Sequence, residues 1–240
     1  MRDLGDLREC SPDALPEALA RLHVETRDAG HATLALSPHL DLATLHALLE
    51  GAGFVLRAAP HADALAMRAH VERVHTLPDR VRPGLRILVC GLNPSLYSAE
   101  TGIPFGRPGN RFWPAARRAG LVDVERDCDA ALRAGIGFTD LAKRATRSSA
   151  ELTADEYRVG VLRVSALVER IAPAAVCFVG LEGYRRAVER SVQPGWLAAG
   201  LGQRPAYLMP CTSGLNARIG VEALAAHLAC AARAADAVAR

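Results

Sequence analysis

From residue 86 onward, the chain alternates short, wholly apolar runs with segments that have helical periodicity. The apolar runs predict buried β-strands at residues 86–90, 135–139, 175–179 and 206–209. The intervening segments predict helices at residues 111–119, 153–171, 182–189 and 219–238. Strands that are buried on both faces and separated by helices are typical of a parallel sheet. We therefore expect a three-layer α/β/α domain around a central, mainly parallel, four-stranded sheet.

Residues 1–80 have a weaker pattern with shorter elements. Helices are predicted at residues 11–22, 40–51 and 63–74, and strands at residues 31–36 and 54–58. Residues 76–84 contain prolines, a glycine and several charges, which is typical of a linker. We therefore expect a small accessory α/β unit at residues 1–80 and a main domain at residues 83–240.

Composition narrows the classes of partner. The 29 Lys and Arg residues nearly balance the 26 Asp and Glu residues, and the net charge is +3. A strongly basic protein would have a far larger net positive charge, so any surface that contacts DNA must be a local one. No apolar run approaches the ~20 residues that span a bilayer. The six cysteines lack the close spacing of zinc or iron–sulfur sites. We expect a soluble, cytoplasmic monomer without a metal or cofactor.

Two loops at the ends of predicted strands contain candidate chemistry. In the first, Gly91 permits a turn that presents Asn93, and Pro94 stiffens that turn. Such a turn is commonly structural, but a neutral amide can also hold a water molecule or bond the polar edge of a ligand. The second loop follows the strand that ends at Met209. Because ligands bind at the carboxyl ends of parallel strands, both loops are expected on the same rim.

A segment rich in Gly and Pro follows the first loop and strengthens a functional interpretation. It presents Phe105, and Asn110 and Arg111 then open a helix that continues with Phe112 and Trp113. A rigid aromatic ring beside an amide suits a planar heterocycle, since the ring stacks on it and the amide bonds its edge. We expect Phe112 and Trp113 in the core, with Asn110 and Arg111 ordering the loop.

These motifs resemble those of the mismatch-specific uracil/thymine-DNA glycosylases, which belong to the uracil-DNA glycosylase superfamily. The first motif is Gly91-Leu-Asn-Pro-Ser95, followed by the run 102–113 that ends in Asn-Arg-Phe-Trp. The second motif is Pro210-Cys-Thr-Ser-Gly-Leu-Asn-Ala-Arg218. The resemblance covers residues 83–237 and implies a uracil-DNA glycosylase-like fold for the main domain.

The resemblance implies a monofunctional DNA N-glycosylase. Such an enzyme flips uracil, or a related deaminated base, out of mismatched double-stranded DNA and hydrolyses the N-glycosidic bond, leaving an abasic site. Asn93 would position the attacking water, and Phe105 would stack on the flipped base. The backbone at Leu92 and Phe105 would read the polar edge of that base. The other base-binding residues implied in the same way are Ser95, Tyr97 and Asn110.

The second motif would contact the duplex. The resemblance implies that this loop enters the double helix, with Leu215 filling the space that the base vacates. Arg218 would contact the orphaned partner base or the phosphates. The DNA-binding residues implied for this loop are Ser213, Gly214, Leu215, Asn216 and Arg218.

Three departures from the family pattern leave the excised base open. Cys211-Thr212 stands where the family has Asn-Pro, the second motif is one residue longer, and Ser95 replaces a glycine. Hypoxanthine, xanthine and alkylated bases are therefore alternatives to uracil. A catalytically weak or inactive protein that binds DNA lesions is another alternative. Asp140, at the end of a predicted strand, either contacts DNA or caps a turn.

Overall fold

The main sheet is built from the apolar runs of the chain. A computed structural model describes residues 2–26, 30–181, 184–185, 189–216 and 219–238. The strands of this sheet are β6 (Ile87–Gly91), β7 (Ile136–Asp140), β8 (Ala175–Val179), β9 (Gly195–Trp196) and β10 (Ala206–Met209). Their order is β7-β6-β8-β10-β9, and all pairs are parallel except β10 with the short strand β9. The prediction of a mainly parallel sheet is confirmed, with β9 added at one edge.

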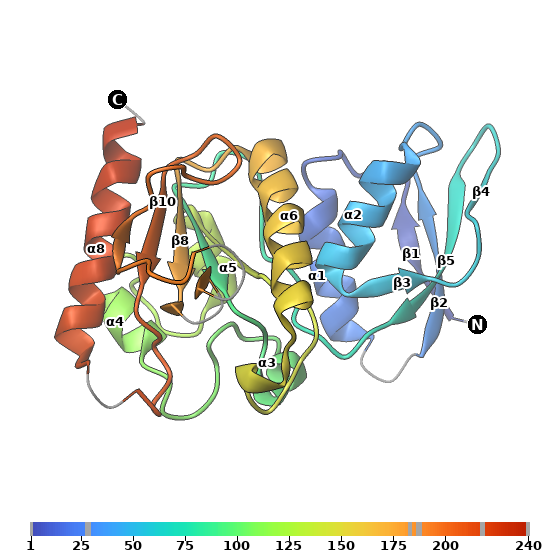
Figure 1. The fold of residues 1–240 in the computed structure, drawn as a ribbon. Coiled ribbons are helices and arrows are strands. Elements are labelled where there is room, and N and C mark those ends of the chain that lie inside the picture. Colours follow the sequence, from blue (N-terminus) through green and yellow to red (C-terminus); the bar gives the residue numbers. More distant parts are fainter. Residues whose placement is uncertain (1, 27–29, 182–183, 186–188, 217–218, 239–240) are drawn as a thin grey trace.

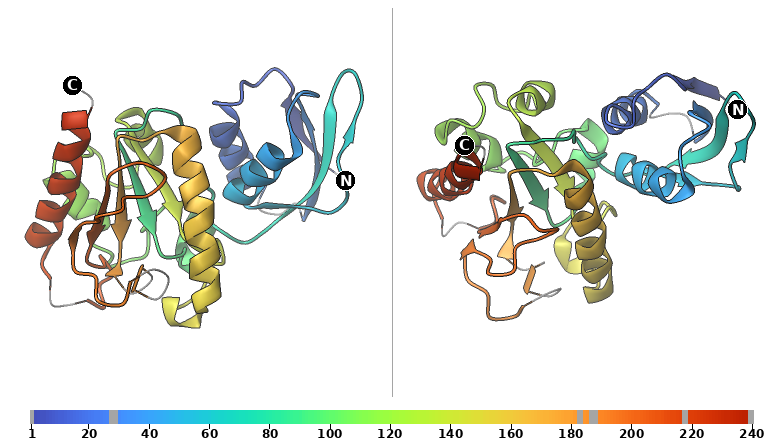
Figure 2. Two further views of the ribbon diagram at one scale, coloured as in Figure 1. Left: turned by 45° about the horizontal axis from the view of Figure 1, so that its top comes forward. Right: turned by 90° about the horizontal axis from the view of Figure 1, so that it is seen from above.

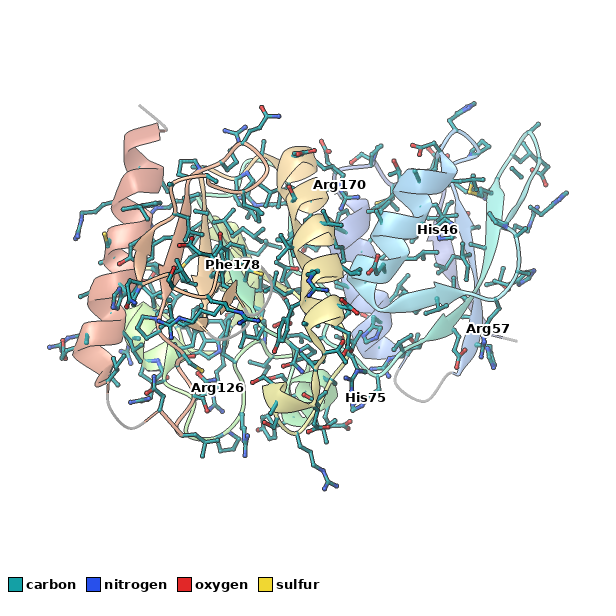
Figure 3. The ribbon with its side chains drawn as sticks, in the orientation of Figure 1. His46, Arg57, His75, Arg126, Arg170 and Phe178 are labelled. Carbon is teal, nitrogen blue, oxygen red and sulfur yellow. The ribbon has the colours of Figure 1, made fainter. Side chains whose placement is uncertain are left out.

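Helices cover both faces of this sheet (Figure 1). Helix α8 (Val221–Val238) and helix α4 (Phe112–Arg118) pack on one face, and α6 (Ala154–Ile171) packs on the other. Every residue of β6, β7, β8 and β10 is buried between these layers. The side chain of Phe178, labelled in Figure 3, belongs to the α6 side of this core. The three-layer prediction is therefore confirmed.

Helix α6 begins where the sequence predicts. Thr153 and Glu156 form both halves of a capping box, and the helix continues to Ile171. Two further short helices, α3 (Leu96–Thr101) and α5 (Cys128–Arg133), were not anticipated from the sequence. Much of the helix predicted at residues 182–189 lies outside the described residues.

The N-terminal unit has a sheet of its own. Its strands are β1 (Arg2–Leu7), β2 (His31–Leu36), β3 (Phe54–Leu56), β4 (His61–Ala62) and β5 (Met67–Arg73). They are ordered β1-β2-β5-β3, with β4 also paired to β5. Helices α1 (Leu15–Glu25) and α2 (Leu42–Ala52) cover one face. These two helices lie between the N-terminal sheet and α6, as Figures 1 and 2 show.

The helix predicted at residues 63–74 is wrong, because this segment contains strand β5. Met67, Ala69 and Val71 are buried, while the residues between them face outward. That period of two is the signature of a strand with one buried face. β5 pairs antiparallel with β2 and β3, so its backbone groups are bonded on both sides.

The segment expected to be a linker is a buried connection. Every residue from Thr76 to Val81 is buried. The backbones of Arg80 and Phe138 exchange two hydrogen bonds of 2.9 Å, which extends the edge of the main sheet beyond β7. On the other side, the Asp79 amide donates to Gly51 O of α2 at 2.8 Å. Residues 76–81 therefore join the two units instead of separating them.

Candidate active site

An open cavity lies at the carboxyl edge of the main sheet. It measures about 950 Å³ when the solvent at its mouth is included. Its wall is formed by the loop after β6, the segment 104–110, the end of β7, residues 146–149 and the loop after β10. Both motifs of the sequence therefore meet at one rim, as expected for ligand sites in parallel sheets.

The Asn93 amide has a fixed orientation at the cavity wall. Its Nδ2 donates to Arg144 O at 3.0 Å, to Thr146 Oγ1 at 2.7 Å and to Pro94 O at 3.2 Å. Backbone carbonyls only accept hydrogen bonds, so the NH₂ side of the amide must face them. No described residue donates to Asn93 Oδ1. This oxygen is therefore left as an acceptor for a molecule in the cavity.

Phe105 forms an aromatic shelf beside Asn93. Its ring stacks on Phe112 with the centroids 4.3 Å apart and an interplanar angle of 22°. Phe105 has a φ of 54°, a conformation that side chains other than glycine rarely adopt. The Trp113 indole fixes this loop by donating to Pro104 O at 2.7 Å. Phe112 and Trp113 are fully buried, which confirms their predicted place in the core.

Asn110 and Arg111 hold the two motifs together. Asn110 Oδ1 accepts from the amide of Phe112, the first residue of α4, at 2.9 Å. The Arg111 guanidinium donates to Ser213 O at 2.9 Å, to Asn216 O at 2.6 Å and to Ile219 O. Three carbonyls of the second loop are thus bound by one side chain of the first motif. This geometry agrees with the ordering role expected from the sequence.

The second loop forms one lip of the cavity. Ser213 and Leu215 line the mouth, and Leu215 is 86% exposed. Gly214 lies against the backbone of Gly109, where a side chain would come within 2.8 Å of Gly109 O. Gly214 and Asn216 do not line the cavity. Arg218 lies outside the described residues.

The comparison with known families agrees with this geometry. The model of the uracil DNA glycosylase superfamily matches residues 78–226. The chain belongs to this superfamily. Superfamily members are typically monofunctional DNA glycosylases, so membership suggests that this chain removes damaged bases from DNA. No helix in the described ranges is long and apolar enough to cross a membrane.

Of the other residues predicted to bind the base, two line the cavity and one does not. Leu92 and Ser95 line the cavity, and Ser95 Oγ also caps α3 by accepting from the Ser98 amide at 3.1 Å. Tyr97 is 41% exposed on the first turn of α3 and does not line the cavity. Because α3 starts directly after Ser95, the helix carries residue 97 away from the rim.

Asp140, whose role the sequence leaves open, lies at the wall of the cavity. It ends β7, next to Gly91 in the paired strand β6, and its side chain reaches the cavity wall. It is only 6% exposed. The pKa of Asp140 is raised to about 6, because the raising effects of burial and of Asp79 together outweigh the lowering effects of Lys143 and Arg163. The signal available in the sequence was an acidic residue at the end of a strand.

Behind the cavity, Asp79 organises a buried group of charges. Its carboxylate accepts from Lys143 Nζ at 2.9 Å, from Arg163 Nη1 at 2.8 Å and from Thr139 Oγ1 at 2.7 Å. Burial raises the pKa of Asp79, but the charges of Arg163 and Lys143 outweigh this and hold it below its usual value. Arg163 also donates to Asp140 O. This group therefore supports the end of β7.

Proposed function

We propose that this protein is a monofunctional DNA glycosylase that excises uracil, or a related deaminated base, from mismatched duplex DNA. The observation that carries the proposal is Asn93, whose amide is locked with Oδ1 as the free acceptor beside the Phe105 shelf. A ring that stacks and an acceptor that holds water are the two groups needed at the base and at the sugar. The resemblance of both motifs to mismatch-specific uracil/thymine-DNA glycosylases supports the same function.

In this mechanism, Asn93 Oδ1 accepts a hydrogen bond from a water molecule and aims its oxygen at the sugar C1′. The N-glycosidic bond breaks with its electron pair going to the base, and the water oxygen bonds to C1′. The attacking water gives up one proton to bulk water, and the departing base anion takes up one proton from bulk water. An amide cannot remove the proton as a base does, and such help is typically worth ~10²–10⁴-fold. The enzyme is therefore slow and acts best on pairs that are already weak.

Base flipping assigns roles to the two sides of the cavity. Extruding a base costs a few kcal/mol, and least at a mismatched pair. The exposed Leu215 side chain is placed to fill the gap in the duplex, while the base enters the cavity and stacks on Phe105. Arg107 and Arg147 line the cavity mouth. Their charges would meet phosphates, which makes binding sensitive to salt.

The test is base release from a G·U oligonucleotide with wild type and Asn93→Ala. We expect the variant to release base at least ~10²-fold more slowly, while its affinity for the duplex is unchanged. Gln193→Ala removes an exposed amide that does not line the cavity and is the control. Undiminished release by Asn93→Ala would remove this residue from the mechanism.

A panel of lesion oligonucleotides decides between uracil and the alternative bases. If the protein releases hypoxanthine, xanthine or an alkylated base but not uracil, the proposed substrate changes and the proposed mechanism stands. The changed residues Cys211 and Thr212, which line the cavity, favour testing this range. If wild type binds mismatched DNA but releases no base from any substrate, the protein is a lesion-binding relative.

A further inference from the structure

The loop that carries Asn93 is held in place by a neighbouring segment, residues 141–146. Arg144 O of this segment accepts from Asn93 Nδ2 at 3.0 Å. Backbone hydrogen bonds of 2.9–3.2 Å also join three of its amides to carbonyls of the loop, namely Leu141 to Gly91, Ala142 to Leu92 and Thr146 to Pro94. The orientation of the Asn93 amide therefore depends on where the Arg144 carbonyl lies.

The carbonyl one residue earlier, Lys143 O, is held by a distant part of the chain. Thr76 Oγ1 donates a hydrogen bond to it. The Lys143 ammonium donates in turn to Leu77 O and to Asp79 Oδ1, and the second of these bonds is 2.9 Å long. Residues 76–79 thus bind Lys143 both at its backbone and at the end of its side chain.

These contacts lie in the interior of the protein. Thr76 is 1% exposed, and the Lys143 side chain is 13% exposed. A buried polar group that loses its partner pays the full cost of leaving water, so this arrangement is strongly preferred over its alternatives. The Arg144 side chain, by contrast, binds Glu156 at the surface, where an ion pair contributes little. The buried contacts to residues 76–79 are therefore the stronger constraint.

Residues 76–81 keep this place through bonds of their own to the main sheet. Arg80 exchanges backbone hydrogen bonds with Phe138 of β7, and Asp79 accepts from Thr139 Oγ1 at 2.7 Å. The constraint on the loop therefore comes from a segment that is itself anchored beside the cavity wall.

We propose that Thr76 and Lys143 are positioning residues for base excision, because they fix the Arg144 carbonyl that orients the Asn93 amide. This inference rests on the proposed function, in which Asn93 Oδ1 holds the attacking water. Neither Thr76 nor Lys143 lines the cavity, so each acts through Asn93 and not on the base.

The chemical consequence is a fixed position for the water. If the Arg144 carbonyl moves, the Asn93 amide loses an acceptor for Nδ2 and can rotate. Its Oδ1 then no longer aims the water at the sugar C1′. Displacing a reacting group by about 1 Å costs on the order of 10²-fold in rate. Duplex binding depends on other groups and is not affected.

The test is a double-mutant cycle of Thr76→Val and Asn93→Ala, measured as single-turnover release of uracil from a G·U duplex at saturating enzyme. Thr76→Val keeps the shape of the side chain and removes its hydroxyl. We expect it to slow release about 10–100-fold, whereas Thr76→Ser retains the hydroxyl and should keep the wild-type rate. In the Asn93→Ala background, Thr76→Val should have no further effect, because residues that act through one group are not additive.

Thr26→Val is the matched control. Thr26 is also buried, and its hydroxyl donates to a backbone carbonyl, Leu22 O, at 2.6 Å, but within the N-terminal unit. This variant should keep the wild-type rate. The inference is overturned if Thr76→Val releases uracil as fast as wild type. It is also overturned if Thr76→Val slows Asn93→Ala by the same factor as it slows wild type, since the loss would then be a general structural one.

A second measurement does not need the glycosylase reaction. The side-chain amide protons of Asn93 can be assigned by NMR as the signals that Asn93→Ala lacks. They should exchange with water about tenfold faster in Thr76→Val than in wild type or Thr26→Val, because Nδ2 loses a fixed acceptor. Equal exchange in the three proteins would overturn the inference. If wild type releases no base from any lesion, the proposed function fails, and this exchange rate still decides whether Thr76 positions Asn93.

Thr76→Val removes a buried hydrogen bond, so its folding is checked first by thermal unfolding. If it does not fold, Lys143→Met takes its place in both experiments, because it removes the ammonium contacts to the same segment. The same outcomes then support or overturn the inference.

Discussion

Replacing Asp79 with alanine should destabilise the protein far more than a surface charge does. The Asp79 side chain is 5% exposed, and its partners Lys143 and Arg163 are 13% and 11% exposed. Removing the carboxylate leaves two buried cations without a counter-charge, which costs about 3–5 kcal/mol. In a chain of this size, 1 kcal/mol shifts Tm by about 2–4 °C. We therefore expect Tm to fall by roughly 6–20 °C.

The assay is thermal unfolding at pH 7, followed by calorimetry and checked by urea denaturation. Asp155→Ala is the control, since Asp155 is 81% exposed and pairs with Arg158 on the surface. Such a pair is worth about 0–1 kcal/mol. Added salt should leave the Asp79→Ala loss nearly unchanged, because buried charges are poorly screened. A loss below about 1 kcal/mol would refute the reasoning.

The pH dependence of this contribution has a definite sign. The pKa of Asp79 is lowered in the folded protein, so its contribution is fully present above its unfolded pKa, about 3.9. That contribution is lost as the pH falls below this value towards the folded pKa. Asp79 also helps to raise the pKa of Asp140 to about 6. The difference in stability between wild type and Asp79→Ala should therefore be largest near pH 5, decrease as the pH rises through 6, and shrink in stronger acid.

Two further predictions concern the rim and the N-terminal unit. Leu215→Ala should slow uracil release from duplex DNA about 10–100-fold, since burial of a leucine is worth ~1.5–3 kcal/mol, and should leave release from single-stranded DNA unchanged. The control is Leu162→Ala, because Leu162 is also exposed but lies on α6. Equal losses on both substrates would contradict a role for Leu215 in filling the gap in the duplex. Removing residues 1–74 should leave base release intact, whereas removing residues 1–82 should abolish cooperative unfolding, because Asp79 and the Arg80 pairing are lost. Calorimetry and base release check both truncations, and a stable protein without residues 1–82 would show that the buried connection is dispensable.

The elements that the sequence predicts well are those whose pattern depends on local chemistry. β8 and β10 have the predicted bounds, because a wholly apolar run between helices has few other interpretations. β5 was misread because its charged residues break the apolar pattern, and its strand character depends on β2 and β3 on either side. Pairing with distant segments leaves little trace in a short window of sequence.

In the candidate site, too, some features depend on local sequence and others depend on distant segments. Asn93 and Phe105 stand in recognisable motifs, and the fold places both at one cavity. The raised pKa of Asp140 comes mainly from burial, and it is adjusted by Lys143, Asp79 and Arg163, of which Asp79 and Arg163 are distant in sequence. Composition made residues 76–84 look like a linker, although Asp79 and Arg80 lie in the interior. Whether a charged residue is buried depends on its counter-charges, which are often distant in sequence and cannot be recognised from a short segment.

Arg111 has a consequence for how the protein meets DNA. By binding three carbonyls of the second loop, it fastens the lip that carries Leu215 to the helix that backs the aromatic shelf. The conformational entropy of that lip is lost when the chain folds, before any DNA arrives. Less ordering then remains to oppose binding, and more of the contact energy is available for opening the duplex. The loop that carries Leu215 and the Phe105 ring should therefore keep the same relative arrangement at intact and at damaged base pairs.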